Sequence, residues 1–146
     1  MDLQNFSFKR VMIIDDVKIG RFVALHVMKK NNFAIEVLEF DLATKAIQYL
    51  EENQHKPEKL PEVIFLDIRM PVMDGFQFLD RLALLNKSLL EIYVFMLSSS
   101  HAAYDRVHAE SNPLVKRFLN KPLNLANLDQ IKALYLLLNN NNDIAA

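Results

Sequence analysis

The chain of 146 residues contains no cysteine and only two glycines, Gly20 and Gly75. Without cysteine it cannot form disulfides, use a catalytic thiol or build a zinc–thiolate site. Two glycines so far apart cannot make the G-x-G-x-x-G or G-x-x-x-x-G-K-[ST] loops that bind nucleotide phosphates. Functions that depend on those loops are therefore excluded.

The chain also lacks an excess of charge of either sign, with 17 basic and 18 acidic residues and a formal net charge of -1. This balance gives no electrostatic reason to expect nucleic acid or an anionic membrane as a partner. The first ten residues, MDLQNFSFKR, lack the basic start and apolar stretch of a signal peptide. No apolar run approaches the roughly eighteen residues of a membrane span. We expect a soluble, cytoplasmic protein.

Apolar residues make up 51% of the chain and charged residues 24%, which is the composition of a globular domain. Several apolar runs are continuous, as in strands whose two faces are both covered. These runs are Val11–Ile14, Val63–Leu66 and Ile92–Leu97. Phe33–Phe40 predicts a mixed strand near a sheet edge, and Leu114–Leu119 a short fifth strand.

Helical patterns lie between these strands and after the last one, over residues 19–26, 43–50, 76–83, 102–110 and 125–138. In the first helix, Ile19, Phe22, Val23 and His26 share one face. Asp41 is the predicted N-cap of the second helix. Ala103 and Val107 are the clearest apolar positions of the fourth, which is only weakly amphipathic.

Strict alternation of strands and helices predicts an α/β fold, a doubly wound parallel sheet with right-handed crossovers. Ligands in such sheets bind at the carboxyl ends of the strands. The residues that follow these ends are Asp15 and Asp16, Asp67, Ser98–Ser100, and Lys121. In a parallel sheet they all lie at one edge.

Three neighbouring carboxylates repel one another, so the cluster needs a cation or a protonated member. Carboxylate oxygens suit Mg²⁺, which favours one or two carboxylates together with a phosphate. Lys121 supplies a point charge for a phosphoryl oxygen and Ser98 a hydroxyl donor. The set indicates phosphoryl transfer, in which the nucleophile is either an aspartate or water.

Four motifs in order, MIIDD, FLDIRMPVMDG, FMLSSS and FLNKPL, make the chain resemble the receiver domain of two-component response regulators. The resemblance covers residues 8–139, leaving 1–7 and 140–146 as terminal extensions. It implies a flavodoxin-like sheet of five strands in the order 2-1-3-4-5, with five helices.

By this resemblance Asp67 accepts a phosphoryl group from a histidine kinase or a histidine phosphotransfer protein. Asp16 binds Mg²⁺ directly, Asp15 acts largely through water, and Asp67 and the backbone carbonyl of Arg69 complete the protein ligands. Ser98 moves toward the phosphoryl group, Phe118 follows inward, and Lys121 contacts a phosphoryl oxygen. The surface of the fourth helix, fifth strand and fifth helix then changes its partners.

Arg69 and Ser100, two residues after the acceptor and after the switch hydroxyl, are our candidates for setting the lifetime of the phosphoryl group. The resemblance implies no catalysis beyond the chain's own phosphorylation and dephosphorylation. Two alternatives are an aspartate-nucleophile phosphatase of the haloacid dehalogenase type and a receiver-like scaffold that takes no phosphate. The sequence leaves the kinase, the downstream protein and phosphorylation-dependent dimerisation open.

Overall fold

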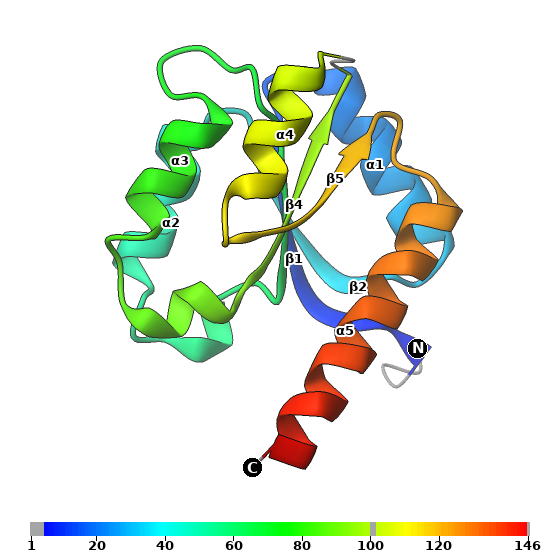
Figure 1. Cartoon of the computed structure of the whole chain (residues 1–146). Coiled ribbons are helices and arrows are strands. Elements are labelled where there is room, and N and C mark those ends of the chain that lie inside the picture. Colours follow the sequence, from blue (N-terminus) through cyan, green and yellow to red (C-terminus); the bar gives the residue numbers. More distant parts are fainter. Residues whose placement is uncertain (1–4, 100–101, 146) are drawn as a thin grey trace.

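A computed structural model of the chain describes residues 5–99 and 102–145, as a parallel sheet between two layers of helices (Figure 1). The elements, in chain order, are β1 (Phe8–Ile14), α1 (Lys18–Lys30), β2 (Ala34–Phe40), α2 (Ala43–Glu52), β3 (Val63–Leu66), α3 (Gly75–Leu82), β4 (Tyr93–Ser98), α4 (Ala103–Ser111), β5 (Val115–Asn120) and α5 (Leu125–Ala145). Short 3₁₀ turns at Pro57–Lys59 and Lys87–Glu91 precede β3 and β4.

The sheet has the order β2-β1-β3-β4-β5, with every neighbouring pair parallel. This confirms the predicted topology, including the edge position of β2. The central strands β3 and β4 are buried along their whole length. Continuous apolar runs therefore identified the strands with helices on both faces.

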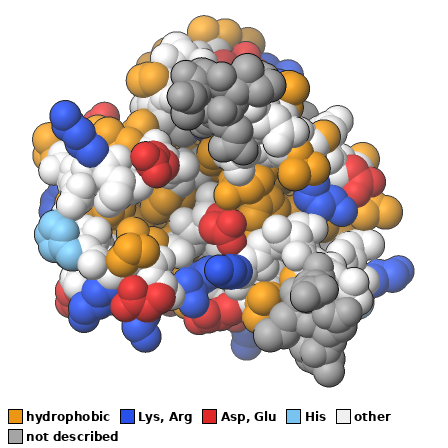
Figure 2. Space-filling view, turned by 90° about the horizontal axis from the view of Figure 1, so that it is seen from below, with side chains coloured by type: hydrophobic (Ala, Val, Ile, Leu, Met, Phe, Trp, Pro, Cys, Tyr) orange, Lys and Arg blue, Asp and Glu red, His pale blue; other side chains and the backbone are white. Residues whose placement is uncertain are grey.

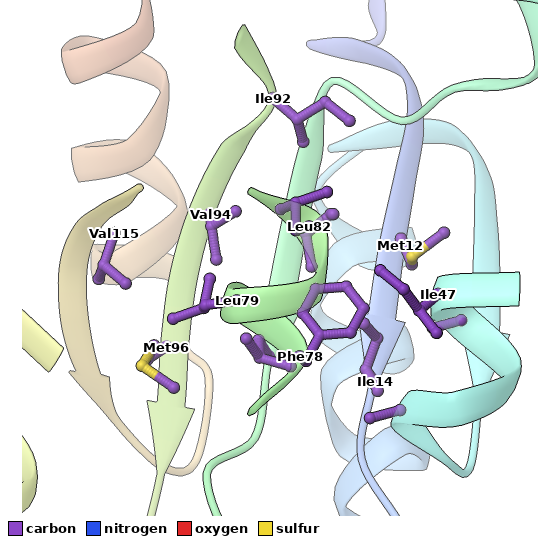
Figure 3. Close-up of a cluster of buried hydrophobic side chains, with 14 of the residues drawn as sticks. Met12, Ile14, Ile47, Phe78, Leu79, Leu82, Ile92, Val94, Met96 and Val115 are labelled. Carbon is purple, nitrogen blue, oxygen red and sulfur yellow. The ribbon is translucent and has the colours of Figure 1, made fainter. Parts of the chain in front are cut away.

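One face of the sheet is covered by α2, α3 and α4. Figure 3 shows how Phe78, Leu79 and Leu82 of α3 pack beside Ile47 of α2 over the strands. The opposite face is covered by α1 and α5. Alternate residues of the same strands point to each layer, as the two-residue period of a strand requires.

The first helix differs from its prediction. Ile19 and Phe22 lie on one side of α1, but their side chains are 70% and 68% exposed, and Val23 and His26 are exposed as well. The sheet instead receives Ala24 and Met28, each 1% exposed. Ala24 and Met28 are spaced i, i+4, so they lie on one side of the helix. This buried side differs from the predicted one that contains Ile19 and Phe22.

The second helix also differs, because Leu42 occupies the N-cap position and no side chain caps the helix. The Asp41 carboxylate instead accepts a hydrogen bond from Lys45 at 2.9 Å. The third helix begins with a full capping box, in which Asp74 accepts from the Gln77 amide and the Gln77 side chain accepts from the Asp74 amide.

The fourth helix buries Asp105 and Ala109, whereas Ala103 and Val107 are exposed. Its inner face therefore carries a carboxylate, which the apolar pattern did not predict. The fifth helix continues to Ala145, beyond the last predicted apolar position at Leu138. Leu136 and Leu137 are 61% and 59% exposed, because the run of apolar residues is wider than the buried stripe.

Figure 2 shows the end of the molecule that carries the amino ends of the strands. Apolar, acidic and basic side chains are mixed on this surface. Within the described ranges, 5–99 and 102–145, no helix combines the length and apolar character that crossing a membrane requires.

Candidate functional site

The carboxyl ends of the strands place the polar residues together, because the hydrogen-bond ladder continues one residue beyond them. The amide of Asp15 donates to Phe40 O at 3.1 Å, and the amide of Asp67 donates to Ile14 O at 3.0 Å. The amide of Lys121 donates to Ser98 O at 2.9 Å. The backbone thus holds both buried acids and the lysine at the same edge of the sheet.

Asp15, Asp16 and Asp67 form one cluster, in which each residue offers a ligand oxygen within 4.8 Å of the others. Asp15 is 2% exposed and Asp67 7%, whereas Asp16 is exposed. The cluster therefore has two buried carboxylates and one that is open to solvent. The sequence prediction that these three acids converge is confirmed.

Lys121 reaches the same cluster. Its Nζ lies 2.7 Å from Oδ2 of Asp15 and 3.3 Å from Oδ2 of Asp67. Burial alone would lower the pKa of Lys121, but the hydrogen bond to Asp15 and the negative charges of Asp67 and Asp15 raise it overall. The ammonium therefore remains charged and offsets part of the repulsion between the acids.

Asp67 has the most perturbed carboxyl group of the cluster. Burial raises the pKa of Asp67 to about 6; the Lys121 charge opposes the rise and the Asp15 charge adds to it. A carboxyl group with this pKa is roughly 90% ionised at pH 7, so it can act as a nucleophile. Perturbed acids of this kind are typical of functional sites.

Backbone amides orient the two buried acids. Oδ1 of Asp15 accepts from the Val17 amide at 2.9 Å, while Oδ1 of Asp67 accepts from the Ile68 amide at 2.8 Å. Arg21 of α1 donates to the main-chain oxygen of Asp15 at 2.6 Å. Because both Asp15 carboxylate oxygens already accept hydrogen bonds, Asp16 is the more available ligand.

Both glycines of the chain lie against these acids. A Cβ atom at Gly20 would lie 2.6 Å from Oδ2 of Asp15. A Cβ at Gly75 would collide with the main-chain oxygen of Asp67 and would lie 2.8 Å from Cε of Met96. From the sequence, the number and spacing of the glycines excluded nucleotide-binding loops. The sequence did not reveal that both glycines leave space beside the acid cluster.

The remaining predicted residues lie on β4 and β5. Ser98 is the last residue of β4 and is 2% exposed. Phe118 is 8% exposed within the core cluster under α2, α3 and α4, and the Arg106 guanidinium lies 5.2 Å from the centre of its ring. Ser100 lies outside the described residues.

Arg69 extends from the loop after β3 to α4, where its Nη2 lies 2.7 Å from Oδ1 of Asp105. Sequence reasoning selected Arg69 but missed Asp105. The available signal was the spacing of Asp105 four residues before Ala109, which places both on one side of the helix. An acid on the buried stripe of a helix requires a cationic partner.

The donor set fits a divalent metal ion, because three hard carboxylate oxygens lie within 4.8 Å of one another and one of the acids is open to solvent. Mg²⁺ prefers such ligands and retains water at its remaining positions. Asp16 and Asp67 have a carboxylate oxygen free of the backbone amide bonds described above. The main-chain carbonyl of Arg69 stays a predicted ligand.

Comparison with known proteins gives a consistent result. The response regulator receiver domain family matches residues 11–132. Histidine kinase CKI1 of Arabidopsis thaliana is 30% identical over 129 residues, which cover 82% of this chain but only 11% of that protein. A two-component response regulator from Cytophaga hutchinsonii has 25% identity and a TM-score of 0.81, covering 88% of this chain and 97% of that one.

A further solved structure, the Mn(2+)-bound form of response regulator Rcp1, has 26% identity and a TM-score of 0.66. The similarity covers 85% of this chain and 88% of that one. The family match extends from β1 into α5, and the predicted strand order and acid cluster are both present. The chain therefore belongs to the family of response regulator receiver domains.

Proposed function

We propose that the chain is a phosphorylation-dependent switch of two-component signalling, with Asp67 as the phosphoacceptor. The observation that carries this proposal is the joint placement of three carboxylates within 4.8 Å and of the Lys121 ammonium 3.3 Å from Asp67. Such a site has a nucleophile, a place for a metal ion and a fixed cation for the transferred group. We assign residues 8–139 to the receiver and place its function in the cytoplasm.

In the proposed reaction an ionised Asp67 oxygen attacks the phosphorus atom of a phosphohistidine. The new O–P bond forms as the N–P bond breaks, and the imidazole nitrogen leaves with the electron pair. Hydrolysis later breaks the O–P bond by attack of water, which restores the carboxylate and releases inorganic phosphate. A pKa of about 6 keeps Asp67 mostly ionised at neutral pH.

The residues of the cluster have two electrostatic roles, metal binding by the acids and contact with the phosphoryl group by the lysine. Asp15, Asp16, Asp67 and the carbonyl of Arg69 would hold Mg²⁺, which supplies charge neutralisation at the phosphoryl oxygens. Lys121 would exchange its contact with Asp67 for one with a phosphoryl oxygen. Because Lys121 already lies 3.3 Å from Asp67, this exchange requires only a small movement.

The donor we propose is a histidine kinase or a histidine phosphotransfer protein. The exposed face of α1 supports a protein donor, because Ile19 and Phe22 are 70% and 68% exposed directly after the acid pair. Val17, next to Asp16, is 48% exposed. Exposed apolar side chains beside the acid cluster favour docking of another protein.

On the output side, Ser98 would donate its hydroxyl to the phosphoryl group and Phe118 would respond to that contact. The partner surface would be α4, β5 and α5, where Tyr104 and Leu125 are 71% and 48% exposed. We propose that Arg69 and Ser100 set the lifetime of the phosphoryl group. A dimer that forms through this surface on phosphorylation is compatible with the proposal.

Incubation with Mg²⁺ and acetyl phosphate, followed by measurement of intact mass, tests the proposal directly. We expect the mass of one phosphoryl group in the parent and no gain in Asp67→Asn. Beryllofluoride, a stable mimic, should bind the parent and not Asp67→Asn, as seen by ¹⁹F NMR. Asp80→Asn, at an exposed acid of α3, serves as the control and should behave as the parent.

The alternatives predict other results. A phosphatase of the aspartate-nucleophile type would turn over small phosphate esters continuously. A scaffold would neither gain mass nor bind beryllofluoride. Either result would overturn the proposed switch.

A further inference from the structure

The buried side of α4 carries a carboxylate, which is unusual for a helix packed on a sheet. Only Asp105 and Ala109 are buried, with Asp105 2% exposed. Tyr104 and Val107, its larger apolar residues, are 71% and 65% exposed. The packing of α4 therefore depends little on buried apolar surface, and a buried carboxylate is costly unless a cation accompanies it.

That cation comes from the loop after the acceptor strand. Arg69 donates from Nη2 to Oδ1 of Asp105 at 2.7 Å, across 36 positions of the chain. Arg69 lies two residues after Asp67, and Asp105 lies in the first turn of α4. The ion pair therefore ties the acceptor loop to the start of the helix.

The two partners differ in their surroundings. The Arg69 side chain is 67% exposed and the Asp105 side chain 2%. Arg69 can turn away through solvent without disturbing any packing. Asp105 can reach water only if the first turn of α4 moves. Separating the pair therefore leaves an uncompensated buried charge, which favours movement of the helix.

We propose that Asp105 is a positioning residue that holds the Arg69 guanidinium against α4, and that this ion pair couples the phosphorylation of Asp67 to the position of α4. The inference rests on the proposed function of Asp67. A phosphoryl group there brings additional negative charge close to Arg69, and guanidinium groups pair strongly with phosphate oxygens. When Arg69 exchanges carboxylate for phosphate, Asp105 is left buried without its cation.

The other contacts of α4 agree with a movable helix. Arg106 lies over the ring of Phe118 at 5.2 Å, and the ring of His108 stacks on Phe76 at 4.0 Å. On the α4 side these contacts are made by Arg106 and His108, which are both exposed and can rearrange at small cost. A shift of the first turn would also move Arg106, which adjoins Asp105 in sequence and covers the predicted switch residue.

Amide hydrogen exchange over residues 105–109 tests the coupling, with and without Mg²⁺ and beryllofluoride. In the parent we expect exchange to become about tenfold faster or more when the mimic binds, since a charged hydrogen bond is lost. In Arg69→Gln, Asp105 is left buried without its cation, so exchange should already be fast without the mimic, and the mimic should add little. Asp105→Asn removes the buried charge that drives the movement, so exchange in this variant should not respond to the mimic, and adding Asp105→Asn to Arg69→Gln should slow the exchange again.

A second readout uses the absence of tryptophan from the chain. Tyr104→Trp places a single fluorophore on α4, and its emission should shift on addition of the mimic. The shift should disappear when Arg69→Gln is added. Glu110→Gln removes an exposed charge from the same helix and should leave both readouts as in the parent.

Binding of the mimic is measured separately by ¹⁹F NMR, which distinguishes a failure of the coupling from a failure of the acceptor site. If Arg69→Gln binds beryllofluoride and α4 still responds as in the parent, the coupling is wrong while Asp67 stays the acceptor. If the parent binds no mimic, the proposed function itself fails. Because Arg69 is exposed, its variant distinguishes these outcomes even if Asp105→Asn does not fold.

Discussion

Gly20 of α1 and Asp15 at the end of β1 lie so close that a Cβ atom at position 20 would be 2.6 Å from Oδ2 of Asp15. The same oxygen accepts a hydrogen bond from Lys121 at 2.7 Å. A glycine inside a helix normally destabilises it relative to alanine. Here it provides the space that lets a buried acid and a lysine meet.

Gly20→Ala tests this relationship. Alanine should stabilise an ordinary helix position by about 1 kcal/mol, but here we expect no gain, because Asp15 must move. The affinity for Mg²⁺ or Mn²⁺ should fall about tenfold, as for other changes beside metal ligands. Calorimetric metal titration measures this, with Lys18→Ala, at an exposed position of α1, as the control. Unchanged affinity in Gly20→Ala would show that the acid does not need this space.

The stability of the protein should depend on the protonation of Asp67. Its pKa is raised from 3.8 to about 6 by burial, so the folded state binds this proton more tightly than the unfolded chain. Ionisation therefore lowers the free energy of unfolding, and this cost develops as the pH rises from about 4 to above 6. Below about pH 4 both states are protonated and the cost is absent.

Asp67→Asn removes this cost. At about pH 8 it should raise the free energy of unfolding by on the order of 2 kcal/mol, and the difference should vanish near pH 4. Urea unfolding at a series of pH values, with a chelator present, measures the effect. A difference that is the same at all pH values would mean that packing, and not charge, distinguishes the two proteins.

Lys121→Met should raise the pKa of Asp67 further above about 6, because the lysine charge is the main influence that lowers it. The carboxyl carbon of Asp67, followed by ¹³C NMR, reports the titration directly. Lys116→Met removes a lysine whose ammonium lies 5.0 Å from the ring centre of Tyr93, and it should leave the titration of Asp67 unchanged.

The loop after Asp67 holds Val72 with φ of 71°, and the Met73 amide donates to Pro71 O across this residue at 2.8 Å. A β-branched residue with positive φ is strained, and Val72 is 84% exposed, so packing does not compensate. Val72→Asn should raise the free energy of unfolding by about 1 kcal/mol. Urea unfolding measures this; Val107→Asn, at an exposed valine of a regular helix, should give no gain.

Phe22→Ala should separate protein donors from small ones. Because Phe22 is 68% exposed, its loss should change the free energy of unfolding by less than about 0.5 kcal/mol. Phosphorylation by acetyl phosphate should keep its rate, while transfer from a histidine kinase or phosphotransfer protein should slow about tenfold or more. Equal slowing with both donors would place the effect at the acid cluster instead of a docking surface.

The strands, their parallel arrangement and the convergence of Asp15, Asp16, Asp67 and Lys121 could all be predicted from the sequence. Continuous apolar runs identify strands that are covered on both sides, and an acid directly after such a run lies at the sheet edge. Other local patterns were less decisive. Asp74 caps its helix, whereas Asp41, the predicted cap of the second helix, pairs with Lys45, because an acid at a helix start has several local partners.

By itself the sequence determined the order of the elements and the chemistry of the strand ends, since both follow from short-range periodicity and chain order. Only the tertiary structure decided which stripe of α1 is buried, because a helical period shows that a stripe exists but not which neighbour it meets. It also decided that Gly20 lies against Asp15 and that Arg69 meets Asp105. Those contacts join different elements of the fold, and their distances are set by the packing of whole elements.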